Sequence, residues 1–104
     1  MTPVLVLTTV GATFDPAPLA THLVEKRLAA CVNVIPQIYS VYRWKGAIEK
    51  QTEHLLLIKT LDEKFEALQA FVQENHSYEV PEIVAVRAEQ VSGFYLVWMK
   101  EYLK

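Results

Sequence analysis

The sequence has little of what would cross-link the chain, cradle phosphate groups or attract polyanions. Only three of the 104 residues are glycine, which excludes a glycine-rich phosphate-binding loop. A single cysteine, Cys31, excludes an intrachain disulfide and favours a reducing compartment. The net charge is −2 and the sequence contains no lysine or arginine run, so nucleic acid and anionic membranes are poor candidate partners.

Long apolar segments are also missing. No stretch approaches the ~20 apolar residues of a membrane-spanning helix, and the apolar run 4–7 is too short for a signal peptide. We therefore expect a cytoplasmic protein. The length predicts one domain over residues 1–104, and a hydrophobic content of 52% favours an oligomer with an apolar interface.

A long hairpin around Gly46 is the central feature of the hydrophobic pattern. Bulky apolar residues recur at every second position on both sides of this glycine, which indicates two strands joined by a tight turn. If the arms run from Cys31 and to Thr60, each has about 15 residues and spans about 50 Å. The arms must then either bend, with Pro36 as the candidate position, or reach a neighbouring subunit.

The rest of the chain reads as two further strands and three helices. The continuous apolar runs 4–7 and 83–86 predict strands buried on both faces. Helices are predicted from Asp15, from a capping box over residues 60–63, and from Ser92. The order predicts an α+β, ferredoxin-like βαββαβ plait with an extra C-terminal helix and a long hairpin between the second and third strands.

Four sequence blocks carry a resemblance to a known family. They are Leu-Ala-Ala-Cys-Val-Asn (28–33), Ser-Val-Tyr-Arg-Trp-Lys-Gly (40–46), Leu-Ile-Lys-Thr (57–60) and Tyr-Glu-Val-Pro-Glu-Ile (78–83). In this order and spacing they resemble the CutA family, the divalent-cation tolerance proteins. The resemblance implies a ferredoxin-like protomer, a homotrimer whose hairpins pair between subunits, and a link to copper and other divalent cations. It implies no firm catalytic activity.

The chain departs from the family pattern at two positions and keeps it at a third. Ser77 stands where relatives usually have the proline of a His-Pro-Tyr loop. Thr8 stands where some members attributed with copper binding have a thiol. His76 matches the family histidine.

The candidate metal ligands are His76 and Cys31. Imidazole and thiolate are the ligands that copper prefers, and His76 lies on a loop where side chains are free to converge. The alternative is a loop histidine that is hydrogen-bonded to backbone. Cys31 is either a small buried hydrophobe or a soft ligand for Cu(I). His22 and His54 are interpreted as structural.

A second set of residues is expected to line clefts between subunits. Trp44 and Tyr78 are aromatic, Lys59 is a strand lysine, and Glu79 is a loop carboxylate. With the cationic residues nearby, the set can hold a small anion. The alternatives are that Trp44 is a packing anchor and that Lys59 and Glu79 form a structural salt bridge.

No enzyme signature is present, because the sequence has no metal-hydrolase histidine pair and no nucleophile beside a base. Three functions remain open. The first is a trimeric protein that binds copper or another divalent cation, without an organic cofactor. The second is a trimeric, PII-like small-molecule sensor or adaptor without catalysis. The third is a structural scaffold in which the trimer itself is the functional object.

Overall fold

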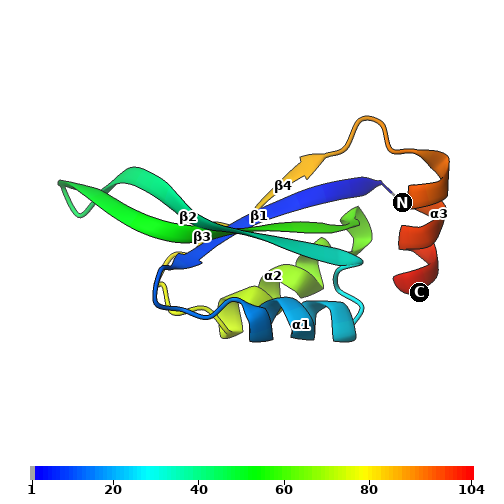
Figure 1. Cartoon of the computed structure of the whole chain (residues 1–104), viewed down its shortest axis with the longest axis horizontal. Coiled ribbons are helices and arrows are strands. Elements are labelled where there is room, and N and C mark those ends of the chain that lie inside the picture. Colours follow the sequence, from blue (N-terminus) through cyan, green and yellow to red (C-terminus); the bar gives the residue numbers. More distant parts are fainter. Residues whose placement is uncertain (1) are drawn as a thin grey trace.

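The computed structural model describes residues 2–104, which form one antiparallel sheet and three α-helices (Figure 1). The strand order is β2-β3-β1-β4, and α1 and α2 lie side by side on one face of the sheet. α3 stands at the end of the sheet opposite the hairpin tip. The elements are β1 (Pro3–Gly11), α1 (Ala17–Glu25), β2 (Cys31–Trp44), β3 (Ala47–Leu61), a 3₁₀ turn (Asp62–Lys64), α2 (Phe65–Glu74), β4 (Val84–Arg87) and α3 (Gly93–Tyr102).

This architecture confirms the predicted ferredoxin-like plait with an extra C-terminal helix. The first and third strands are central, and all three strand pairs are antiparallel. No helix in residues 2–104 has the length and apolar character needed to cross a bilayer.

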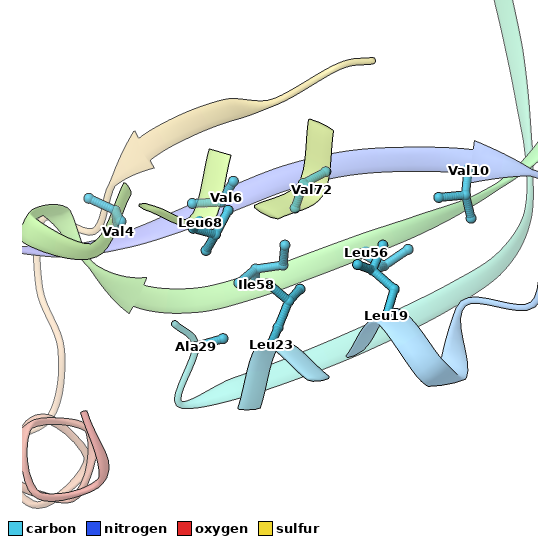
Figure 2. Packing of buried hydrophobic residues seen from close by; sticks show 10 residues of the cluster. All are labelled: Val4, Val6, Val10, Leu19, Leu23, Ala29, Leu56, Ile58, Leu68 and Val72. Atoms are coloured by element: carbon cyan, nitrogen blue, oxygen red, sulfur yellow. The ribbon is translucent and has the colours of Figure 1, made fainter. Parts of the chain in front are cut away.

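The core lies between the central strands and the two helices that cover them. Because successive side chains of a strand point to opposite faces, the even-numbered residues of β1 and β3 face the helices. Figure 2 shows how these residues meet one stripe from each helix: Val4, Val6 and Val10 of β1, Leu56 and Ile58 of β3, Leu19 and Leu23 of α1, Leu68 and Val72 of α2, and Ala29.

The hairpin has the predicted length and bends where a bend is expected. Its arms have 14 and 15 residues, and the molecule is 44 Å long. Lys45 and Gly46 form the two-residue turn, both with positive φ (48° and 82°), as the twist of a tight hairpin favours. The register with β3 shifts between Ile35 and Ile38, and Gln37 has φ of 60°, so the chain bulges directly after Pro36.

His54 fixes this bulge in place. Its Nδ1 accepts the backbone N–H of Gln37 at 3.4 Å, and its Nε2 lies 3.1 Å from the carbonyl oxygen of Ala12. The side chain thus ties the bend of β2 to the loop that follows β1, which agrees with its interpretation as structural.

The helix caps follow the sequence predictions in two cases out of three. Asp15 accepts the N–H of Ala17 at 3.0 Å, and Ser92 accepts the N–H of Tyr95 at 3.4 Å. The predicted capping box is wrong. Thr60 still belongs to β3, and its hydroxyl donates to the carbonyl oxygen of Leu28 at 2.7 Å instead.

The expectation that residues 83–86 are buried on both faces is also wrong for a single chain. β4 is a short edge strand whose four residues are all exposed. Val84 and Val86 pair with Leu7 and Leu5, so their side chains lie on the sheet face opposite the helix-covered core. The continuous apolar run 83–86 therefore indicates an exposed apolar surface that another element can cover. It does not indicate a central position in the sheet.

Two buried threonines provide a matched test of this core. The hydroxyl of Thr8 is fully buried and has no hydrogen-bond partner in residues 2–104, whereas that of Thr60 is satisfied. Thr8→Val keeps the shape and removes an unpaired polar group, so we expect it to raise the free energy of unfolding by about 1 kcal/mol. Thr60→Val should lower it by about 1 kcal/mol. Urea unfolding measures both, and destabilisation by Thr8→Val would contradict this description of the core.

Candidate functional site

A cleft of about 840 Å³ lies between the outer half of the hairpin and the loop that joins α2 to β4. It opens on the sheet face opposite α1 and α2, because the odd-numbered residues of β3 point away from the helix-covered core. Its lining residues are Thr9, Ser40, Val41, Tyr42, Trp44, Glu49, Gln51, Glu53, Ser77, Tyr78, Glu79, Val80 and Glu82.

A hydrogen bond between Tyr78 and Glu53 joins the two walls of the cleft. The phenol oxygen of Tyr78 donates to Oε2 of Glu53 at 2.7 Å, and Glu53 is only 4% exposed. Burial raises the pKa of Tyr78 well above its usual value, and the bond to Glu53 raises it further. Tyr78 is therefore a neutral donor at physiological pH.

The cleft is acidic. Four carboxylates line it, and no lysine or arginine among residues 2–104 does. Burial raises the pKa of Glu82, and the negative charge of Glu53 adds to that rise. The four acidic residues are Glu49, Glu53, Glu79 and Glu82.

His76 holds the loop wall of the cleft. Its Nε2 lies 2.6 Å from the carbonyl oxygen of Thr9, and its Nδ1 accepts the backbone N–H of Tyr78 at 3.0 Å. These partners assign the neutral tautomer with the proton on Nε2. The ring also stacks on Phe14, at 6.4 Å between ring centroids. Both nitrogens are occupied, so metal binding through Nδ1 would first have to break the bond to Tyr78.

The structure does not bring the two predicted metal ligands together. Cys31 is paired with Lys59, whose partner on β1 is Leu5. His76 contacts Thr9, which lies about 13 Å further along β1 at ~3.3 Å per residue. Within residues 2–104 no group of three or more His, Cys, Asp and Glu side chains is placed to hold a metal ion. His76 and Cys31 thus do not form a joint site within one chain.

Three of the four predicted cleft residues do meet. Trp44, Tyr78 and Glu79 line the cleft, whereas Lys59 does not. The Lys59 Nζ instead lies 5.7 Å from the ring centroid of Tyr95, near α3. The proposed pairing of Lys59 with Glu79 is therefore absent within one chain.

The sequence reasoning missed Glu53, Glu49 and Glu82. Residues 49–54 are all polar, so the sequence pattern did not mark one face of the outer hairpin. Glu49 and Glu53 share a face because the side chains of a strand alternate. Only the fold shows that the loop after α2 crosses this face and adds Glu82.

The geometry defines a small ferredoxin-like protein with an extended hairpin and an acidic cleft beside the outer half of that hairpin. The family model described as CutA1 divalent ion tolerance protein matches residues 4–102. The chain belongs to this family.

Relatives and solved structures agree with this assignment. Over 97 residues the chain is 43% identical to the divalent-cation tolerance protein CutA of Thermus thermophilus, covering 93% of this chain and 94% of the relative. The human protein CutA is 51% identical over 83 residues, which are 80% of this chain and 46% of the relative. The chain thus spans about half the length of the animal relatives, including 54% of the Xenopus laevis CutA homologue.

Solved structures of the family superpose along nearly the whole chain. CutA1 from Oryza sativa has a TM-score of 0.94 at 36% identity, covering 100% of this chain and 95% of that one. The divalent cation tolerance protein of Thermus thermophilus has a TM-score of 0.93 at 41% identity, covering 98% of this chain and 99% of that one.

The acidic cleft predicts a specific pH dependence. Because the pKa of Glu82 is higher in the folded than in the unfolded protein, its charge destabilises the fold at neutral pH and not below about pH 4. Glu82→Gln should therefore raise the melting temperature at pH 7, and this gain should vanish on acidification to pH 4. Glu89→Gln, at an exposed position near the other end of the sheet, is the control. An equal rise in melting temperature at pH 7 and pH 4 would show that the charge of Glu82 is not the cause.

Proposed function

We propose that the protein is a homotrimer that binds divalent cations, copper among them, and that it does so without catalysis. The observation that carries the proposal is the uncovered sheet face, on which the apolar surface and the acidic cleft lie next to each other. The family assignment supports the divalent cation, and two features of this face support the assembly and the site.

The first feature is apolar surface that a single chain leaves open. Leu5, Leu7, Leu55 and Leu57 of the central strands are only partly buried, and their neighbours on β4 are about half exposed. A contiguous apolar surface of this kind in a small protein marks an interface.

The second feature is that both outer strands have a free edge. β2 and β4 each pair on one side only, so their remaining backbone groups can pair with another copy. Contact between two different edges is heterologous, and repeating it around an axis closes a ring. A ring of three in which the hairpins pair between subunits would cover the open face.

The cation-binding part of the proposal rests on the carboxylates of the cleft. A single chain assembles no set of three ligands within residues 2–104, so a cation in the cleft would take its remaining ligands from water or from a neighbouring subunit. Copper has the highest affinity of the divalent series for such ligands. The proposed site is therefore completed either by water or by a residue of a neighbouring subunit.

One experiment tests both parts. The purified protein is titrated by calorimetry with Cu(II) and Zn(II), and its mass is recorded by light scattering on the same sample. We expect three times the 11.9 kDa chain mass and saturable binding with integral stoichiometry per trimer. Binding should be weakened by Glu79→Gln/Glu82→Gln and retained by His76→Ala. Leu57→Glu, which places charge on the open face, should yield monomer.

The outcomes separate the alternatives. Loss of binding in His76→Ala with retention in the glutamine variant would show that His76 is the ligand and that the cleft is not the site. Weak, fractional binding in every variant would make the metal incidental. A wild-type protein with the mass of one chain would overturn the trimer.

The alternative function, a small-molecule sensor, is favoured by the size of the cleft together with its aromatic lining. Its predicted ligand was a small anion. The carboxylates that line the cleft and the distant position of Lys59 argue against an anion in the cleft of a single chain.

A further inference from the structure

The bulge in β2 has a single residue of β3 opposite it. The register advances by one residue across the bulge, so Pro36 and Gln37 together oppose His54. A bulge leaves its extra residue without a partner in the ladder. Pro36 has no N–H to satisfy, and the N–H of Gln37 donates to Nδ1 of His54. The side chain of His54 thus supplies the acceptor that the ladder lacks at this point.

The bulge decides which side chains of the outer half of β2 face the cleft. Because side chains alternate along a strand, one extra residue reverses the alternation of every residue beyond it. Tyr42 lies opposite Glu49 beyond the bulge, so Tyr42 and Trp44 lie on the face that carries the cleft. Arg43 lies on the other face of the hairpin.

The same sequence fits a second register that has no bulge. If the inner pairing of β2 with β3 continued unchanged, Val41 would lie opposite Glu49. The turn would then consist of residues 44–46. Three-residue turns are common in hairpins and favour a left-handed last residue, which is a glycine here. In this slipped register Val41 and Arg43 would face the carboxylates in place of Tyr42.

The observed register contains two backbone conformations that the slipped register does not need. Gln37 in the bulge has φ of 60°, and Lys45 in the turn has φ of 48°. Residues with a Cβ atom disfavour this left-handed region. The three-residue turn places only its glycine there. Pro36 is compatible with both registers, because β2 is an edge strand. Local backbone preference therefore favours the slipped register, and other contacts must hold the observed one.

We propose that His54 is a positioning residue that selects the bulged register of the hairpin, and that without it the outer half of β2 slips by one residue. Its Nδ1 accepts the N–H of Gln37 at 3.4 Å, a bond that only the bulge makes possible. Its Nε2 donates to the carbonyl oxygen of Ala12 at 3.1 Å, which fixes the ring from the side of the β1–α1 loop. The two registers would present either aromatic side chains or Arg43 to the carboxylates of the cleft. This inference goes beyond the proposed binding of cations and does not depend on it.

Cross-strand disulfides report the register directly. In a Cys31→Ser background, which removes the native thiol, Ser40→Cys is combined with either Gln51→Cys or Lys50→Cys. Ser40 lies opposite Gln51 in the observed register and would lie opposite Lys50 in the slipped one. Neighbouring residues of a strand point to opposite faces, so each cysteine pair can close in one register only.

The measurement compares these two cysteine pairs, which we call the observed-register pair and the slipped-register pair. The full-length proteins, in their native assembly and without added metal, are equilibrated in a glutathione buffer. Disulfides within one chain are quantified by peptide mass spectrometry, and circular dichroism shows that each protein is folded. With His54 present, we expect the observed-register pair to close and the slipped-register pair to stay open.

Variants of His54 test the cause. His54→Leu removes both bonds and should raise closure of the slipped-register pair, relative to the observed-register pair, about tenfold, as the loss of one or two hydrogen bonds implies. His54→Gln, a milder change, keeps a donor near Nε2 but loses the acceptor at Nδ1, and should slip as well. His54→Asn carries an amide oxygen near the position of Nδ1 and should restore the observed register.

Two further variants complete the set. Gln37→Gly makes the left-handed backbone of the bulge acceptable, so adding it to His54→Leu should reduce the slip. His22→Leu is the matched control, because it removes a histidine of α1 that lies outside the hairpin. It should leave the ratio of the two disulfides unchanged.

Several outcomes would overturn the proposal. Closure of the slipped-register pair that stays as low in folded His54→Leu and His54→Gln as with His54 would show that other contacts hold the register. High closure with and without His54 would show that the hairpin samples both registers independently of this residue. Slip in His54→Asn as large as in His54→Leu would show that the acceptor for Gln37 is not the cause. The readout needs no metal, so its failure leaves the proposed function standing, and the reverse also holds.

Discussion

The antiparallel pairing of β1 with β3 is the constraint on which the rest of the structure depends. It joins nine residue pairs, from Pro3 with Leu61 to Gly11 with Glu53, without a bulge. Since side chains alternate, this one register places Val6 and Ile58 against the helices. It directs the odd-numbered residues of both strands to the open face. It also places Glu53 of β3 opposite Gly11, the last residue of β1. A shift by one residue would exchange the core with the open face.

The open face then divides into two parts with different chemistry. Near α3 it is apolar, as in a surface that another copy covers. Towards the hairpin tip it becomes acidic and aromatic, and the loop after α2 closes over it. His76 connects the parts, because it holds the loop by its bond to Tyr78 and is itself held by the backbone of β1. Its most direct role is to position Tyr78, and so to shape the cleft.

Local patterns predicted the fold well and the site only in part. Period-two apolar residues and Pro36 predicted the hairpin and its bend, since both depend on neighbouring residues. Thr60 was misread as a helix cap because its partner, Leu28, is distant in sequence. Trp44, Tyr78 and Glu79 line a cleft of the single chain and Lys59 does not, while their place in a cleft between subunits stays a prediction. The acidic character of the cleft depends on the loop between α2 and β4, which crosses the face of β3. Hydrophobic periodicity along the sequence does not predict such a crossing.

The central claim is that other copies of the chain cover the open face and the free strand edges. Hydrogen exchange of the wild-type protein tests it most directly, through the amides of β4 and the outer half of β2 that have no partner within the chain. The account predicts that these amides exchange at least roughly 100-fold more slowly than amides of exposed loops. Exchange as fast as that of an exposed loop, in protein at micromolar concentration, would contradict it.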